Sequence, residues 1–416
     1  MVDGTNLIGL RYARDEYFRG GEEECYNNRS VWINTLKNEL YLLNKSKTNW
    51  YYKLKNVFLK SIKMFSKIYP VKPRKKIWIG PLFERYSSAF NQLPYNFIVS
   101  HINPSIGSLL KLCTSNIVFN PIPDSCYINL YKGIIEGDKN ILQLGMDELE
   151  EMLKILNLDL IIIHNDLVPI NQAIILVARK LGIPTAEIQH GTYQSDYLPN
   201  GRYVDYLFVW GEYFKNIYVE NRIIKPSNVK ILGYPFQIKK YDNPNNVKKI
   251  VIFLGQNLEV FNKDLIYNKV ETVINIQKIC ESLNFDFFYR PHPGDNLKLL
   301  KSELKDIKFT PTGETLDETL KKGDVFISFN STTLIEANLY HKLGIQLKSY
   351  DLPTDNFEDI GACSKTVNTF EELEEYLRQI KQEGISSLYK PVKTSYMEIP
   401  YPDLKTRFYE LIEEII

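Results

Sequence analysis

Cysteines are few in this sequence, and long apolar runs are absent. The five cysteines are odd in number and include no Cys-x-x-Cys pair, so we predict neither a disulfide framework nor a zinc site. No stretch reaches the roughly 18 apolar residues that span a bilayer. The first residues also lack the basic and apolar regions of a secretory signal. These absences predict a cytoplasmic protein that does not cross a membrane.

An excess of charge of either sign is also missing. The 416 residues include 51 Lys and Arg against 50 Asp and Glu, which argues against a nucleic-acid partner. With 44% hydrophobic and 24% charged residues, the composition is that of a globular protein. At roughly 100–200 residues per domain, the length indicates two domains.

The balanced total conceals one strongly basic segment. Between Glu39 and Glu84 there is no acidic residue, whereas eleven residues are basic. In residues 50–69 the apolar side chains recur every three or four positions, which predicts an amphipathic helix with lysines beside its apolar face. We interpret residues 50–76 as a candidate contact with an anionic membrane, on its inner face. The alternative, a helix packed on the first domain, fits the pattern equally well.

From residue 76 onward, short apolar runs alternate with amphipathic stretches, which is typical of βαβ units in parallel sheets. A polar segment that starts at Lys239 separates two such series, and we interpret it as an interdomain linker. Strands are expected at 76–80, 96–100, 158–163, 184–188 and 206–210, and then at 249–255, 285–290, 325–328 and 344–347. Helices are expected over 170–181 and 264–283.

The predicted fold class is α/β, with two Rossmann-like domains facing a central cleft and an N-terminal helical extension. Residues 1–75 form the basic extension, 76–238 the N-terminal domain and 248–395 the C-terminal domain. Residues 396–416 are predicted as a helix, for which packing back on the N-terminal domain is one option. Ligands of such sheets bind outside the carboxyl ends of the strands, so we expect the functional residues there.

One strand of the second domain ends in Arg290-Pro291-His292-Pro293. The two prolines restrict the backbone, so Arg290 and His292 are held together at a strand end with little entropy left to lose. Two cationic or donor groups in this place suit a diphosphate, and we predict that both bind one. The alternative is a rigid turn in which His292 only satisfies a carbonyl group.

Three successive hydroxyl residues follow the next strand. Ser331, Thr332 and Thr333 precede an apolar helical stretch, where hydroxyl groups cap backbone N–H groups and the helix dipole attracts phosphate. Glu336 lies one turn further on, in a position to accept hydrogen bonds from ribose hydroxyls. The alternative is the cap of an ordinary helix.

The first strand of the second domain ends in Gly255-Gln256. A glycine in this place allows the backbone to approach a phosphate closely. We therefore add both residues to the predicted phosphate site, beside Arg290 and His292.

Strand ends of the first domain offer candidates for acid–base chemistry. His190 lies between Gln189 and Gly191 and would contact a substrate, or else hold its own loop. Asp166 follows the strand over 158–163 and suits a general base, although Asn-Asp after a strand is also common turn chemistry. Glu84, in the loop after the first strand, is a competing base.

The order of these motifs resembles that of a known enzyme class. In chain order they are Gln189-His190-Gly191, Trp210-Gly211-Glu212, Gly233-Tyr234-Pro235, Arg290-Pro291-His292-Pro293, and Ser331-Thr332-Thr333 with Glu336-Ala337. The series resembles the GT-B glycosyltransferases that build bacterial capsule and lipopolysaccharide, particularly the sialyltransferase, polysialyltransferase and Kdo-transferase families. It is also similar to the glycerophosphotransferases of teichoic-acid synthesis. The likeness covers residues 76–349.

The resemblance implies a glycosyltransferase with a nucleotide-sugar donor, CMP-sugars being favoured, and a glycan or glycolipid acceptor. The acceptor would bind to the N-terminal domain and the donor to the C-terminal one, without a metal or other cofactor. His292 would meet the donor phosphate or assist the leaving group, Ser331 and Thr332 would bind phosphate, and Glu336 would bind the ribose. The acidic pair that supplies the base in sialyltransferase-like families is missing, so the base stays open, as does inversion or retention.

Three other functions also fit the residues. An epimerase of nucleotide sugars has the same fold. Transfer of glycerol phosphate from CDP-glycerol uses the same phosphate sites and differs in the bond that breaks. A non-catalytic GT-B subunit that binds a polysaccharide or a partner enzyme is the third, because fold does not determine function.

Overall fold

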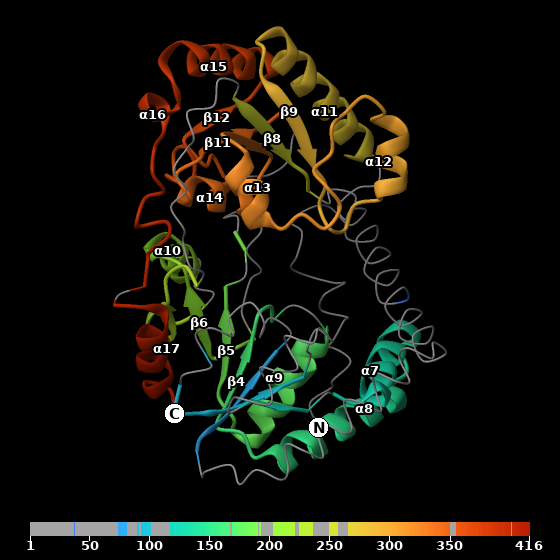
Figure 1. Ribbon diagram of the computed structural model, residues 1–416. Coiled ribbons are helices and arrows are strands. Elements are labelled where there is room, and N and C mark those ends of the chain that lie inside the picture. Colours follow the sequence, from blue (N-terminus) through green and yellow to red (C-terminus); the bar gives the residue numbers. More distant parts are fainter. Residues whose placement is uncertain are drawn as a thin grey trace. The chain divides into compact units, whose positions relative to one another are not determined.

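The structure is a computed structural model of the chain. It describes residues 37, 74–80, 90, 93–100, 117–120, 122–166, 169–189, 191–192, 203–220, 224–235, 249–256, 265–349, 355–400 and 402–416. These residues form two compact units (Figure 1). The first unit contains the described residues up to Gln189, those from 203 to 235 and those from 398 to 416. The second contains Gly191, Thr192 and the described residues from 249 to 397.

The first unit is built on a seven-stranded sheet whose strand pairs are all parallel. In spatial order the strands are β3 (Ile117–Phe119), β2 (Asn96–Val99), β1 (Lys76–Ile79), β4 (Leu160–Ile163), β5 (Thr185–Ile188), β6 (Tyr206–Val209) and β7 (Val229–Ile231). The chain moves outward from β1 to β3 and then returns to place β4 on the other side of β1. Open α/β sheets bind their ligands at such a switch point.

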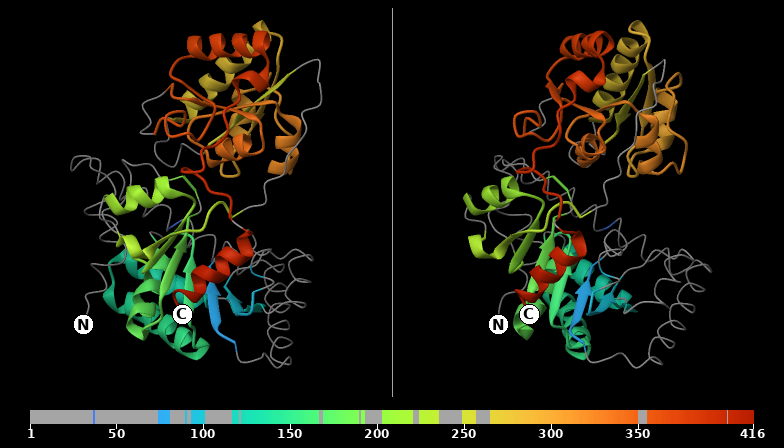
Figure 2. Two further views of the ribbon diagram at one scale, coloured as in Figure 1. Left: turned by 90° about the vertical axis from the view of Figure 1, so that its left-hand side faces the viewer. Right: turned by 60° about the vertical axis from the view of Figure 1, so that its left-hand side comes forward.

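A helix from the end of the chain completes the core of the first unit. Ile77, Leu160 and Phe208 lie on one face of the sheet and pack with Phe408 and Leu411 of α17 (Leu404–Glu413). Figure 2 shows α17 lying across these strands. Each of the five side chains is at most 1% exposed, and full burial of one such side chain stabilises the fold by about 1.5–3 kcal/mol.

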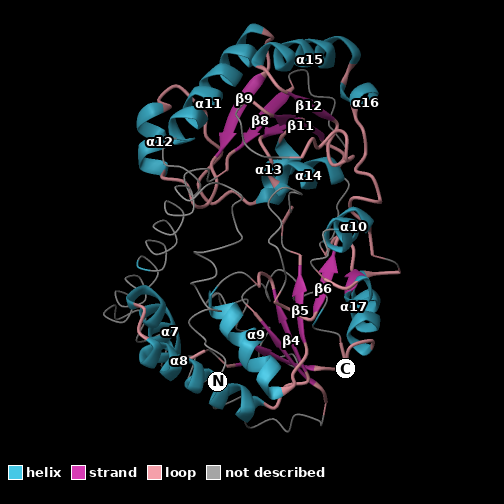
Figure 3. Ribbon diagram, turned by 180° about the vertical axis from the view of Figure 1, so that it is seen from behind, coloured by secondary structure: helices cyan, strands magenta, loops and turns pink. Residues whose placement is uncertain are grey.

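Among the elements that the structure bounds, the other helices of the first unit lie between strands in the sequence. Figure 3 shows helices in cyan and strands in magenta. They are α7 (Asp124–Glu136), α8 (Lys139–Leu156), α9 (Pro169–Leu181), α10 (Glu212–Glu220) and the 3-10 turn η2 (Pro226–Asn228). Asp138 starts α8 by accepting the N–H of Asn140 at 2.8 Å. After α9, Gly182 has a φ of 71°, the left-handed conformation that ends many helices and favours glycine.

The second unit contains a five-stranded sheet, also parallel. In spatial order its strands are β12 (Lys365–Val367), β11 (Leu343–Leu347), β10 (Val325–Ser328), β8 (Ile250–Leu254) and β9 (Asp286–Arg290). Its helices are α11 (Leu265–Ser282), α12 (Leu297–Glu303), α13 (Leu316–Lys322), α14 (Thr332–Leu339), α15 (Phe370–Glu383) and α16 (Ile385–Leu388). The switch point of this sheet lies between β8 and β10.

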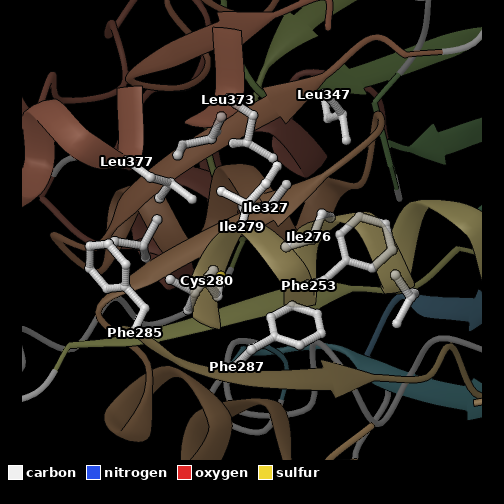
Figure 4. Packing of buried hydrophobic residues seen from close by; sticks show 14 of the residues in the cluster. Phe253, Ile276, Ile279, Cys280, Phe285, Phe287, Ile327, Leu347, Leu373 and Leu377 are labelled. Carbon is white, nitrogen blue, oxygen red and sulfur yellow. The ribbon is translucent and has the colours of Figure 1, made fainter. Parts of the chain in front are cut away.

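The core of the second unit joins the sheet to α11 and α15. Figure 4 shows aromatic side chains of the strands meeting aliphatic side chains of the two helices. The residues labelled there are Phe253, Ile276, Ile279, Cys280, Phe285, Phe287, Ile327, Leu347, Leu373 and Leu377. Because these strands carry apolar residues at successive positions, both faces of the sheet can be covered, as is usual for parallel sheets.

The α/β class with two Rossmann-like units, predicted from the sequence, is confirmed. All nine expected strands correspond to strands of the structure, which adds β3, β7 and β12. These three have three residues each, too few for a periodic pattern to be recognised. The basic segment before residue 74 and the linker up to residue 248 lie outside the described residues. In the described part of the chain, no helix is long and apolar enough to cross a bilayer.

Candidate functional site

Three loops meet at the carboxyl edge of the second sheet, around its switch point. Gly255 and Gln256 follow β8, His292 follows β9, and Ser331 follows β10 after a two-residue turn. Because β8 pairs with both β9 and β10, the loops that leave these strands are neighbours. The fold thus brings the predicted phosphate-binding residues of this unit to one edge.

The His292 imidazole is held by its own loop. Its Nδ1 accepts the Gly294 N–H at 3.0 Å, and the His292 backbone N–H donates to Asp295 Oδ2 at 2.8 Å. Since Nδ1 serves as an acceptor, the neutral ring carries its proton on Nε2. The residue is exposed. An N–H donor therefore stands at the sheet edge, where it suits a phosphate oxygen.

Arg290 is partly engaged within the protein. Its Nη1 donates to the Glu314 carbonyl at 3.1 Å and also to the Thr319 hydroxyl. Burial lowers the pKa of the guanidinium and the charge of Glu314 opposes this, but an arginine stays protonated at neutral pH. The hydrogen bonds to described residues all use Nη1, which leaves Nε and Nη2 as donors for an anion.

Ser331 is the N-cap of α14. Its Oγ accepts the Thr333 N–H at 3.2 Å, so the capping alternative considered from the sequence describes what Ser331 does here. Thr332 Oγ1 accepts the Thr192 N–H at 3.2 Å. Both hydroxyl groups keep a hydrogen to donate, and the helix end adds partial positive charge. Glu336, one turn on, is 6% exposed, and its contact with a ribose stays a prediction.

Gln256 connects the loops after β8 and β10. Its Oε1 accepts the Asn330 N–H at 2.8 Å, and its Nε2 donates to the Asn330 side chain. Beside it, the Ser328 hydroxyl donates to the Leu254 carbonyl at 2.8 Å. The Gln256 side-chain amide thus bonds to Asn330, and it holds the loop after β8 against the loop after β10.

Gly255 is needed for a reason that the sequence analysis did not consider. A Cβ atom here would lie 2.7 Å from the Tyr289 hydroxyl oxygen and 3.1 Å from the His292 backbone nitrogen. Its missing side chain therefore makes room for the loop after β9. Whether a phosphate also approaches Gly255 stays a prediction.

Two residues that the sequence analysis did not single out form a buried pair at these loops. Lys269 of α11 and Asp295 form an ion pair of 2.8 Å, with both side chains fully buried. A signal was available, because Lys269 follows Ile266 by three positions and precedes Val273 by four. A lysine within the apolar stripe of a helix needs a buried partner.

Asp166 lies at the switch point of the first sheet, three residues after the end of β4. It is 0% exposed, its backbone N–H donates to Glu187 Oε2 at 3.0 Å, and its Oδ2 accepts the Tyr203 N–H at 2.8 Å. Gln189, the neighbour of His190, is 1% exposed and accepts the Trp210 N–H at 2.9 Å. Part of the Asp166 carboxylate thus holds a loop, and its action as a base stays a prediction.

Two predicted site residues, His190 and the alternative base Glu84, lie outside the described residues. Within the described ranges, no three side chains of His, Cys, Asp or Glu gather in a way that could hold a metal ion.

No family model matches the chain, and none of the curated proteins matches it. Similar solved structures exist for four-fifths of its length. A UDP-N-acetylglucosamine 2-epimerase from Listeria monocytogenes, described as putative, is 11% identical with a TM-score of 0.55, covering 82% of this chain and 96% of that one. The enzyme from Neisseria meningitidis bound to UDP-GlcNAc is 14% identical with a TM-score of 0.54, covering 82% and 98%. The enzyme from Methanocaldococcus jannaschii, in complex with UDP-GlcNAc and UDP, is 17% identical with a TM-score of 0.50, covering 82% and 99%.

The chain has the GT-B fold. At these identities the likeness concerns the fold, and function has to be argued from the site. The likeness supports the GT-B fold predicted from the sequence. It does not distinguish the sialyltransferase, polysialyltransferase or Kdo-transferase families, so the resemblance to them stays a prediction.

Proposed function

We propose that the protein is a glycosyltransferase that moves a sugar from a nucleotide-activated donor to a surface-polysaccharide or lipid-linked acceptor, without a metal. The second unit would hold the nucleotide, and the first unit would hold the acceptor. A cytidine nucleotide, as in a CMP-sugar, is favoured by the sequence resemblance alone.

One observation carries this proposal. At the carboxyl edge of the second sheet, the Arg290 guanidinium comes from the end of β9, the His292 Nε2–H from the loop after β9, and the N-terminus of α14 from the chain after the neighbouring β10. All three are donors or positive groups, and His292 is oriented by the Gly294 N–H. This set suits the phosphates of a nucleotide sugar, and such contacts are strengthened where water is excluded.

The reaction would place these groups where charge develops. The acceptor hydroxyl oxygen attacks the anomeric carbon, the bond from that carbon to the phosphate oxygen breaks, and the hydroxyl proton passes to a base, for which Asp166 is our candidate. Negative charge then grows on the leaving nucleotide. His292 and Arg290 would stabilise that charge, and one such donor contributes about 2.7–4 kcal/mol in an active site.

A nucleotide screen tests the first step. CMP, CDP, UDP and GDP are added separately, and the unfolding temperature of the protein is measured, because a ligand that binds only the folded state raises stability. We expect at least one nucleotide to stabilise the wild-type protein and not the His292→Asn variant. Failure of all four to bind would contradict a nucleotide site.

A nucleotide-sugar 2-epimerase is the second candidate, because the three similar structures reported above are described as such enzymes. The two functions differ in what happens without an acceptor. Incubation with UDP-GlcNAc alone, followed by proton NMR, would detect an epimer at C2 if the protein is an epimerase. For a transferase we expect unchanged sugar, and nucleotide release that depends on an added acceptor.

A further inference from the structure

The Lys269–Asp295 pair is the most deeply buried charge pair among the described residues. Lys269 Nζ lies 2.8 Å from Asp295 Oδ1, and neither side chain is exposed. Taking two charges out of water costs several kcal/mol per ion, and an apolar pair of the same size often packs as well or better. A gain in stability is therefore a weak explanation for this buried pair. The other hydrogen bonds of Lys269 and Asp295 indicate what the pair does.

Asp295 closes the turn that contains His292 through hydrogen bonds. Its Oδ2 accepts the Tyr289 hydroxyl at 3.0 Å and the His292 N–H at 2.8 Å, while its own N–H donates to the His292 carbonyl at 2.9 Å. The turn so closed places the Gly294 N–H on His292 Nδ1. The carboxylate thus acts on the imidazole through the backbone of one short turn.

Lys269 extends this network to the other two loops. Its Nζ also donates to the Gln256 carbonyl at 3.2 Å, and the Gln256 side chain bonds to Asn330, the residue before the Ser331 cap. One chain of contacts therefore joins the loops after β8, β9 and β10. The ammonium group also balances the Asp295 charge, which would otherwise repel an anion bound near His292.

We propose that Asp295 is a positioning residue for the nucleotide site, which sets the His292 imidazole with Nε2–H outward, and that Lys269 neutralises its buried charge and links it to the loop after β8. The statement about the nucleotide rests on the proposed function, whereas the statement about His292 does not.

Two double variants differ in one property. Lys269→Met with Asp295→Asn removes both charges but keeps a side-chain oxygen that can accept the His292 N–H. Lys269→Met with Asp295→Leu removes both charges and that acceptor. Neither leaves an unpaired buried charge, so we expect both to fold, and thermal unfolding checks this.

The readout is the imidazole spectrum of the protein labelled with ¹⁵N-histidine, in which two-bond proton–nitrogen correlations report the tautomer. The His292 signals are assigned by their loss in His292→Asn. We expect the wild type and the Asn-containing double variant to show the Nε2–H form of His292. We expect the Leu-containing variant to show a mixture of tautomers, and to bind UDP or CDP about tenfold more weakly.

Asp324→Leu is the matched control. Asp324 is 5% exposed and accepts the Ile250 N–H at 2.9 Å at the opposite, amino edge of the same sheet. We expect it to lose stability without changing the His292 signals. A wild-type His292 spectrum in the Leu-containing double variant would overturn the positioning role. Failure of the wild type to bind any nucleotide would instead overturn the proposed function, while the spectra decide the role at His292.

Discussion

His292 and His341 are both exposed histidines of the second unit, yet their surroundings differ. The His292 ring is oriented by the Gly294 N–H at the carboxyl edge of the sheet. His341 has a φ of 61° in the turn after α14, and its ring lies 5.7 Å from that of Tyr389. The same residue type thus offers a directed donor in one place and a surface contact in the other.

We expect His292→Asn to reduce nucleotide release from the donor about 100-fold, because the variant lacks the Nε2–H donor for the leaving phosphate. His341→Asn is the control, since asparagine tolerates the left-handed conformation at that position. Turnover and unfolding temperature are measured for both variants. Similar turnover in the two would remove His292 from the site.

Ser331→Ala should also slow the release of nucleotide from the donor. The loss of the helix cap should lower the free energy of unfolding by about 1 kcal/mol.

Asp166→Asn should abolish transfer and leave nucleotide binding nearly unchanged, because a base acts on the acceptor whereas the second unit holds the donor. Asp205→Asn is the control, since Asp205 Oδ2 accepts the Thr185 N–H at 2.9 Å at the amino edge of the same sheet. Transfer rate and nucleotide affinity are measured for both. Equal loss of transfer in the two variants would assign Asp166 a structural role only, and Glu84→Gln would then be tested as the base.

At the scale of elements, each unit has a glycine directly after its first strand, but the atoms around the two glycines differ. Among the atoms of the described residues, a Cβ at Gly80, after β1, would lie no closer than 3.6 Å to a heavy atom outside its chain neighbours, an ordinary contact. At Gly255, after β8, it would lie 2.7 Å from the Tyr289 hydroxyl and 3.0 Å from the Arg290 carbonyl. The close approach of two loops, and not the strand end itself, demands the glycine.

Gly255→Ala should therefore displace the loop after β9 and weaken nucleotide binding, whereas Gly80→Ala should leave both stability and binding close to wild type. Overpacking of a tight contact typically costs about 1–3 kcal/mol of stability. Urea unfolding and nucleotide affinity measure the two effects. Unchanged affinity in Gly255→Ala would mean that the position of the β9 loop does not matter for the ligand.

At the scale of the whole molecule, the basic segment over residues 50–76 is a sequence property with a physical consequence. Near an anionic membrane, each basic residue contributes on the order of 1 kcal/mol, and this attraction is screened by salt. We expect salt-sensitive sedimentation with anionic vesicles, lost when Lys53, Lys60, Lys63 and Lys67 are changed to Glu.

The control for this experiment changes the same charge elsewhere. Lys298, Lys301, Lys305 and Lys308 are exposed on the second unit, and their change to Glu should leave vesicle binding largely intact. Equal sedimentation of the wild type with neutral and anionic vesicles would count against membrane docking.

The sequence by itself was sufficient to predict the α/β class, the two units and most of their strands. Apolar periodicity is a local property, and it indicates a buried strand or helix wherever a run is long enough. Strand ends and their polar residues follow from it, so the sequence alone predicts Arg290, His292 and Ser331 at one edge of the sheet.

Only the tertiary structure decided which distant side chains form hydrogen bonds or ion pairs with one another. Asp295 pairs with Lys269, which lies 26 residues away, and Gln256 reaches Asn330 across 74 residues. Similarly, the packing of α17 on the first sheet joins the end of the chain to strands that begin near residue 76. Such contacts depend on the path of the chain through both sheets, because no local pattern specifies which distant partner a buried charge or amide will meet.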